Sequence, residues 1–153
     1  MRRHRSTAIA TALAVAGLAA PAGAQAAANP YTAQQVCGAS YALAQSIPLR
    51  SNDGKVQLGQ ISLMYSLETG KSCGVVMKTR QIGRATYTSV TVGKKPKKPT
   101  KPVHWKEDAG NFRYYAGPVY ASGTPACVRV GGYMHVPHGR EGIYVEPGWE
   151  GCS

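Results

Sequence analysis

The sequence predicts an all-β protein: a small disulfide-bonded sandwich or barrel of about 7–8 short antiparallel strands. Short runs of alternating apolar and polar residues are separated by turn signals at intervals of about 8–12 residues. No stretch beyond residue 28 has the period of a long amphipathic helix. The four cysteines Cys37, Cys73, Cys127 and Cys152 follow a predicted export signal. An even number of cysteines in an exported chain indicates two disulfides formed in an oxidising compartment.

Residues 1–28 have the pattern of a secretory signal peptide. Arg2, Arg3 and Arg5 precede an apolar run over 8–20, and the Ala-rich residues 24–28 offer an Ala-x-Ala cleavage site. This run is shorter than the roughly 20 residues of a membrane-spanning helix. We therefore expect export, no transmembrane segment, and a single all-β domain over residues 29–153.

The start of this domain is predicted to form one helical turn followed by a strand. Thr32 can cap a turn over residues 33–36, which Gly38 would end. Residues 41–47 alternate between larger and small side chains, which predicts the first strand. Pro48 has no backbone N–H, so it marks the exit of this strand or an edge position.

The central stretch predicts a hairpin. Residues 51–54 form a turn, and Gly59 is a candidate bulge between two strand phases. The alternation over 60–67 is typical of a half-buried strand, and the polar residues 68–71 reverse the chain. The return strand, which ends at Thr79, carries Cys73, Val75 and Met77 on one face.

The second half of the chain predicts further short strands around one unusual loop. A turn at 81–83 leads into a strand over 84–92, which is rich in Thr, Val and Tyr. Residues 93–102 are rich in Lys and Pro, and this composition favours an extended loop. The remaining strands are expected over 103–106, 112–120 with an interruption at Gly117-Pro118, 127–130, 133–136 and 143–145, with turns at 108–111, 122–125 and 138–139.

Three pairings of the four cysteines are possible. We favour Cys37–Cys73 and Cys127–Cys152, because each joins nearest neighbours in sequence, and each would stabilise the fold by about 3 kcal/mol. No two cysteines are closer than 25 positions. This spacing argues against a zinc site, which needs close ligand pairs.

The basic loop is the candidate anion-binding site. The chain has a net charge of +11; without Arg2, Arg3 and Arg5 it has 15 Lys and Arg against 7 Asp and Glu, a net charge of +8. The possible anion-binding residues are Lys94, Lys95, Lys97, Lys98 and Lys101. Extended lysines can follow an anionic polymer and release its counterions, although a solvated loop is the plainer interpretation. Wall-polymer or lipid phosphates fit better than nucleic acid, since only Trp105 could stack on bases nearby.

Two other groups of residues are candidates for chemistry. His135, His138 and Glu141, with Arg140, could bind a metal or act as acid and base in a small secreted hydrolase. Pro137 and Gly139 prevent a regular helix there, so an exposed turn is the plainer interpretation. Ser40 lacks the context of a nucleophile elbow. We therefore predict no catalytic residues, no metal site and no cofactor.

The aromatic residues are a third candidate. Tyr114, Tyr115, Tyr120, Trp105 and Trp149 could form a flat sugar-binding platform. Half-buried strand positions also favour Tyr and Trp, so packing in the core is the plainer interpretation.

Several short segments occur in the order found in a known family. They are Val36-Cys37-Gly38, Gly70-Lys71-Ser72-Cys73, Tyr114-Tyr115-Ala116-Gly117-Pro118-Val119, Cys127-Val128 leading to Gly131-Gly132, and the closing Cys152. With these segments the chain resembles the spore-associated protein A family of small secreted actinomycete proteins, from about residue 36 to residue 152. The Lys/Pro-rich loop departs from the family pattern.

The resemblance implies a secreted, non-enzymatic protein associated with the cell or spore surface of a sporulating actinomycete, with no catalytic residues to carry over. Two alternatives stay open. One is a binding module for anionic cell-wall or spore-surface polymers, and the other is a small secreted hydrolase that uses the His/Glu cluster. The sequence does not indicate an oligomeric state.

Overall fold

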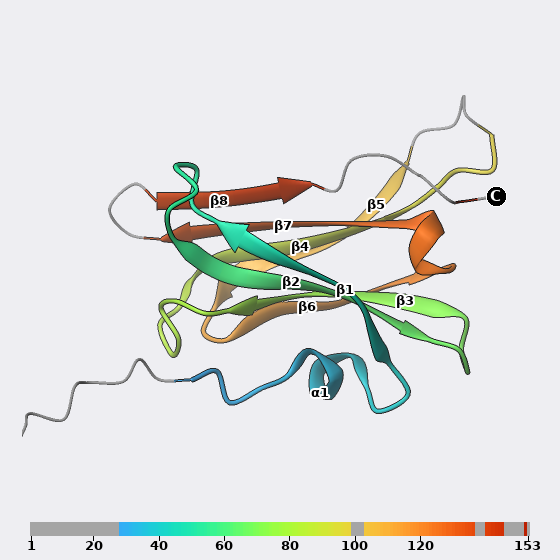
Figure 1. The fold of residues 1–153 in the computed structure, drawn as a ribbon, viewed down its shortest axis with the longest axis horizontal. Coiled ribbons are helices and arrows are strands. Elements are labelled where there is room, and N and C mark those ends of the chain that lie inside the picture. Colours follow the sequence, from blue (N-terminus) through green and yellow to red (C-terminus); the bar gives the residue numbers. More distant parts are fainter. Residues whose placement is uncertain (1–27, 99–102, 137–139, 146–151, 153) are drawn as a thin grey trace, which may run out of the picture.

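The computed structural model describes residues 28–98, 103–136, 140–145 and 152. In these residues the chain forms two four-stranded antiparallel sheets that pack face to face, with one short helix outside them (Figure 1). The prediction of an all-β sandwich is thus confirmed. Apart from Ala28, the predicted signal peptide lies outside the described residues.

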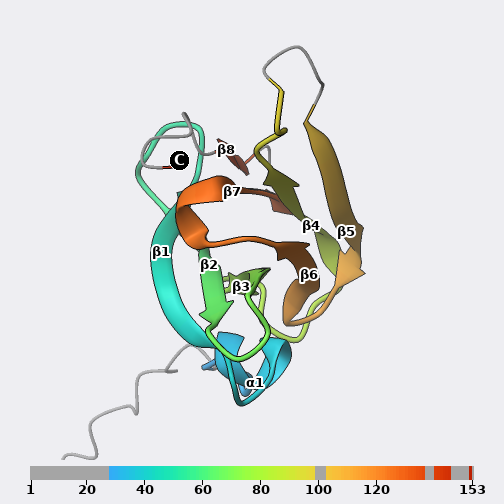
Figure 2. The ribbon, with the colours of Figure 1, turned by 90° about the vertical axis from the view of Figure 1, so that its right-hand side faces the viewer.

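The strands divide between the sheets as follows. The first sheet has the order β1-β2-β3-β6, formed by β1 (Ala42–Arg50), β2 (Gln57–Ser66), β3 (Lys71–Lys78) and β6 (Tyr115–Ser122). The second has the order β5-β4-β7-β8, formed by β5 (His104–Phe112), β4 (Thr86–Lys94), β7 (Val128–Val136) and β8 (Arg140–Val145). The helix α1 (Ala33–Cys37) lies against the outer face of the first sheet, and a 3-10 turn (Pro125–Cys127) precedes β7 (Figure 2).

The main core lies between the two sheets. It contains fully buried aliphatic side chains from both, among them Leu49, Ile61, Leu63, Val76, Val90, Val92, Val130 and Met134. Alternation along β2 sends Ile61 and Leu63 into this core and Met64 to the opposite face.

A second, smaller core lies under α1, and it corrects the expectation of a half-buried central hairpin. Met64, Cys73 and Val75 face away from the main core but are still buried, because α1 covers them. The disulfide Cys37–Cys73 joins the end of α1 to β3. The central hairpin is therefore buried on both faces.

The capping of α1 follows the sequence prediction. Thr32 Oγ1 accepts a hydrogen bond from the Gln35 backbone N–H at 3.2 Å, and Gln35 Oε1 accepts one from the Thr32 N–H at 2.8 Å. This reciprocal pair satisfies two donors that the first turn leaves open. Tyr120 Oη donates to the Cys37 carbonyl at 2.9 Å, which ties the end of α1 to β6. Burial, and secondly the nearby Tyr41, raise the pKa of the Tyr120 hydroxyl.

Two strands are longer than predicted. The expected turn at 108–111 lies within β5, and Gly131-Gly132 lies within β7 rather than between two strands. Glycine is common in turns, but here Gly132 is needed because the space between the sheets admits no side chain. A Cβ atom at position 132 would lie 2.8 Å from Val76 Cγ2 of the facing sheet.

The edges of the sheets match the prediction in part. Pro48 lies in β1, which is an edge strand, and the β1–β2 register shifts beside Gly59 as the bulge prediction expected. In the second sheet the outer strand β5, which pairs with β4, carries the exposed charged residues Lys106 and Glu107.

A buried lysine closes one end of the sandwich. Lys78 is fully buried at the end of β3, and its Nζ donates to Arg84 O at 2.7 Å, Thr86 Oγ1 at 2.7 Å and Phe112 O at 3.0 Å. All three partners are neutral oxygens, so burial lowers the pKa of Lys78 from 10.5 to about 8. Because its three N–H groups are engaged, the ammonium joins the turn before β4 to the end of β5.

Candidate anion-binding site

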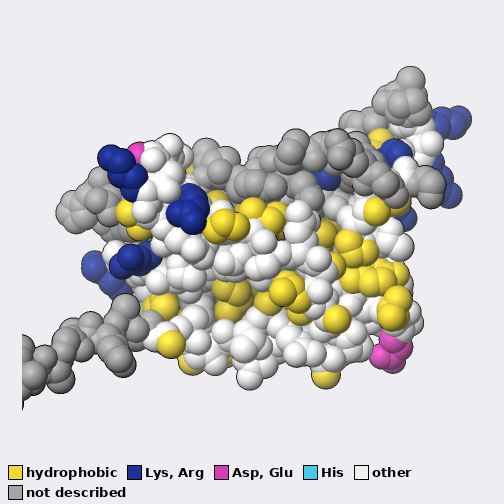
Figure 3. Space-filling view, in the orientation of Figure 1, with side chains coloured by type: hydrophobic (Ala, Val, Ile, Leu, Met, Phe, Trp, Pro, Cys, Tyr) yellow, Lys and Arg dark blue, Asp and Glu magenta, His cyan; other side chains and the backbone are white. Residues whose placement is uncertain are grey.

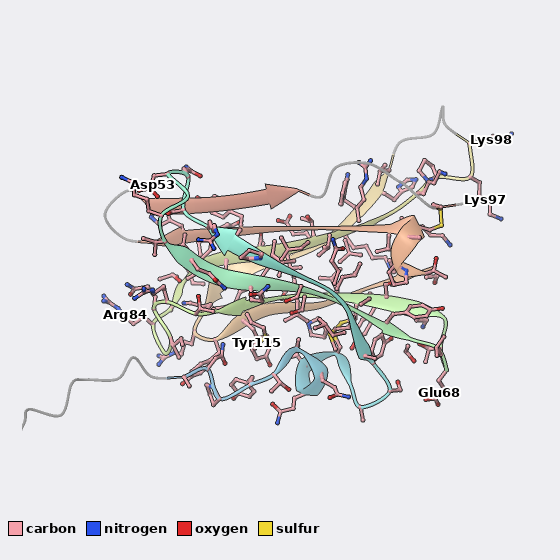
Figure 4. The ribbon with its side chains drawn as sticks, in the orientation of Figure 1. Asp53, Glu68, Arg84, Lys97, Lys98 and Tyr115 are labelled. Atoms are coloured by element: carbon pink, nitrogen blue, oxygen red, sulfur yellow. A yellow bond between two sulfur atoms is a disulfide. The ribbon has the colours of Figure 1, made fainter. Side chains whose placement is uncertain are left out.

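The predicted basic loop begins later than expected. Gly93 and Lys94 belong to β4, where they pair with Trp105 and His104 of β5 and with Arg129 and Val128 of β7. Strand pairing on both sides extends β4 to Lys94. Lys95, Lys97 and Lys98 then leave the sheet at one end of the long axis, where Figure 4 shows the last two side chains projecting outward. Lys101 lies outside the described residues.

The segment is attached to the C-terminal disulfide. The backbone N–H of Lys95 donates to Cys127 O at 3.0 Å, and its Nζ donates to Cys152 O at 2.6 Å. The disulfide Cys127–Cys152 covalently joins the two acceptors. Both favoured disulfides are thus present, and among the described residues no cysteine is free to bind zinc.

A pocket of about 340 Å³ lies between the lysines and this disulfide. Its lining consists of Lys94, Lys95, Pro96, Lys97, Cys127 and Cys152. Lys94, Lys97 and Lys98 are exposed, and no carboxylate of the described residues forms an ion pair with them. Lys and Arg side chains gather mainly at the two ends of the long axis (Figure 3). Several positive charges beside a concave, partly apolar wall attract anions.

The lysines of this pocket supply groups that can bind anions. Ammonium groups on flexible stems donate to phosphate or carboxylate oxygens as point charges, without demanding one geometry. Neither a nucleophile with a hydrogen-bonded base nor a pair of carboxylates lines the described pocket. Salt should weaken such binding, because it competes with counterion release.

The His/Glu cluster gains no support as a metal or acid–base site. His135 is exposed on β7, and the backbone register pairs it with Glu141 of β8. His138 lies outside the described residues. Within the part of the chain that is described, no group of three His, Cys, Asp or Glu residues could hold a metal ion. The Ser40 hydroxyl lies 3.2 Å from that of Ser66, which is no general base.

The described members of the candidate aromatic platform do not form one surface. Tyr120 packs against Tyr41 with ring centroids 5.6 Å apart, and Trp105 covers Gly93. Tyr114 and Tyr115 instead meet Tyr31, which the sequence reasoning missed. The sequence offers no signal for this contact, because Tyr31 lies in the short lead-in after the predicted cleavage site. Trp149 lies outside the described residues.

Comparisons with known proteins give one informative match. No protein-family model matches the chain, and no solved structure matches it. In the described residues no helix is long and apolar enough to cross a membrane. Over 99 residues, or 65% of its length, the chain is 34% identical to spore-associated protein A of Streptomyces coelicolor. It spans 56% of the length of that relative. This match confirms the resemblance found in the sequence: the chain is a relative of spore-associated protein A.

Proposed function

We propose that this chain is a secreted, non-enzymatic protein that associates with the cell or spore surface of a sporulating actinomycete. Its relative is named for association with spores. Its four cysteines form two disulfides, which suits an oxidising extracellular space. The expected signal peptide fits the same location.

We further propose that the segment Lys94–Lys98 holds the protein to anionic polymers of that surface. The observation that carries this proposal is the set of lysines around the disulfide-backed pocket, with Lys95 fixed to Cys152 O and its neighbours exposed. The fixed lysine positions the segment, while the exposed lysines remain available to phosphate or carboxylate groups. Phosphate-bearing wall polymers are the preferred partner, because successive charges can meet successive lysines.

The test is cosedimentation of the exported protein with purified cell walls over a series of salt concentrations. Binding should weaken as salt rises. The double variant Lys97→Gln/Lys98→Gln should bind more weakly. A plot of log affinity against log salt concentration should also become less steep by up to about 2 units, since each lysine that neutralises a phosphate contributes roughly one unit to the steepness.

The control removes the same charge at the other end of the long axis. Arg50 and Lys55 are exposed and flank the turn that holds Asp53, which lies far from Lys97 in Figure 4. The variant Arg50→Gln/Lys55→Gln should keep most of the affinity and the full salt slope. Equal losses in both double variants would reduce the effect to overall charge and contradict the proposed site.

A further inference from the structure

A second pocket lies at the other end of the sandwich. It has a volume of about 330 Å³ and is lined by Tyr31, Phe112, Arg113, Tyr114, Tyr115 and Gly117. Figure 4 shows Arg84 at this end and Lys97 and Lys98 at the opposite end. The strand β4 connects the two regions, since it follows Arg84 and ends at Lys94.

Three tyrosines form the aromatic wall of this pocket. The Tyr31 ring meets Tyr114 at a centroid distance of 5.4 Å and Tyr115 at 5.2 Å, both edge to face. Tyr31 is 43% exposed, although it contacts two other rings. In the described part of the chain none of the three hydroxyls makes a hydrogen bond, whereas Tyr120 uses its hydroxyl on Cys37 O. The wall therefore combines apolar ring surface with three phenol groups that can donate or accept.

The pocket is held in shape by buried and backbone contacts. Asn29 Nδ2 donates to Tyr114 O at 2.7 Å and to Lys78 O at 3.1 Å, and its Oδ1 accepts from the Tyr31 N–H at 3.1 Å. Lys78 contributes its backbone N–H to Tyr114 O at 2.9 Å and its Nζ to Phe112 O at 3.0 Å. A preformed pocket loses little conformational entropy when a ligand binds.

Positive charge adjoins the rings. Arg113 is exposed, and in the described residues its guanidinium makes one long hydrogen bond, from Nη1 to Gly83 O at 3.5 Å. The Gly83 N–H in turn donates to Arg113 O at 3.0 Å. This contact brings the turn with the exposed Arg80 and Arg84 beside Arg113. Guanidinium groups bind carboxylates through two parallel hydrogen bonds.

We propose that this pocket binds a sugar unit that carries a carboxylate. A pyranose has an apolar face of C–H groups, which suits the tyrosine rings, and an edge of hydroxyls, which suits the phenols. The carboxylate would pair with Arg113. A bare anion would leave the aromatic wall unused, and a purely apolar ligand would bury the phenols and the arginine without partners. The proposal concerns a site separate from the lysine segment and does not depend on it.

The test is an NMR titration of the exported protein with two matched probes. N-acetylmuramic acid and N-acetylglucosamine share one ring, but only the former carries a lactyl ether with a carboxylate. The acidic sugar should shift the ring resonances of Tyr31, Tyr114 and Tyr115 and should bind more tightly than the neutral sugar. Absence of these shifts at sugar concentrations up to about 10 mM would overturn the proposal.

Four variants separate the contributions. Tyr31→Ala should lower the affinity for both sugars about tenfold. Tyr31→Phe keeps the ring packing and should lower the affinity less. Arg113→Gln should bring the affinity for the acidic sugar down to that for the neutral one. Tyr87→Ala removes an exposed tyrosine that packs with Tyr133 elsewhere, and it should change nothing.

A variant at the opposite end of the sandwich tests whether the loss of any positive charge weakens sugar binding. Lys97→Gln should leave sugar binding unchanged even if it weakens binding to cell walls. Equal weakening of the acidic sugar by Lys97→Gln and Arg113→Gln would overturn the pocket assignment, whatever the outcome for the lysine segment.

Discussion

The side chain of Lys95 donates a hydrogen bond of 2.6 Å from Nζ to the backbone oxygen of Cys152. This bond joins the basic segment to a residue that the disulfide already links to Cys127. The end of β4, the start of β7 and residue 152 are thereby fixed to one another. The candidate site thus depends on long-range contacts as well as on the local lysine sequence.

The two disulfides should differ in their reaction with a mild thiol reductant. Cys37, at the end of α1, and Cys73, on β3, are both buried, whereas Cys127 and Cys152 are each half-buried. We expect Cys127–Cys152 to open first and to open faster in Lys95→Gln, which loses the side-chain tie to residue 152. Alkylation of the released thiols followed by mass spectrometry measures both rates. Equal opening of the two disulfides in the wild-type protein would refute the expected order.

Stability should rise with pH above about 8 because of Lys78. Its pKa is lowered to about 8 in the folded protein and returns to 10.5 on unfolding, so between these values the unfolded chain binds more protons. Stability therefore increases as pH rises through this window. Between pH 7.5 and 9.5 the gain should be about 1–2 kcal/mol. Urea unfolding at several pH values measures this change.

The matched control for this effect is Lys78→Met, which has a similar length and no titrating group. Its stability should lack the rise seen in the wild-type protein over the same window. Limiting the comparison to pH below 9.5 avoids most tyrosine ionisation. A variant that shows the same rise would assign the effect to another group.

Gly132→Ala should destabilise the fold by about 1–3 kcal/mol, because a small-to-large change overpacks the contact between the sheets. The added Cβ would lie 2.8 Å from Val76 Cγ2 and 2.9 Å from Ile61 Cδ1. The control is Gly110→Ala in the outer strand β5, where the nearest atom, Phe112 Cζ, is 3.3 Å away and belongs to a half-buried side chain. Urea unfolding should show a clearly smaller loss for the control.

Asn29→Ala should loosen the start of the folded domain without unfolding it. The change removes both hydrogen bonds from Nδ2 and the acceptor of the Tyr31 N–H. Hydrogen exchange at Tyr31 should become faster, and both sugar probes should bind less tightly. Intact mass checks that the wild-type protein and the variant begin at the same residue, and unchanged exchange would show that Asn29 does not hold the segment.

The sequence predicted the features that depend on local chemistry. The Thr32 cap, the edge position of Pro48 and the strand faces around Cys73 follow from side-chain type and period. Even the disulfide pairing followed from the preference for neighbouring cysteines.

Features that depend on distant contacts were missed or wrong. A Gly-Gly pair is common in turns, and Gly132 therefore suggested a break between two strands. In the structure it lies within one strand, where the facing Val76 and Ile61 leave no room for a larger residue. Lys78 gives no sign of burial in the sequence, since its three oxygen partners lie up to 34 positions away. The tyrosine pocket joins residue 31 to residues 114 and 115, and no local pattern connects them.

The proline in β1 has a consequence for molecules crowded together on a surface. An open strand edge is a template on which another chain can add its own backbone, which leads to fibrils. Of the four outer strands that the structure describes, β1, β5, β6 and β8, β1 contains Pro48, which has no backbone N–H to offer a neighbouring chain, and β5 carries exposed charged residues. Both features disfavour the addition of a second copy of the chain at the edges formed by β1 and β5.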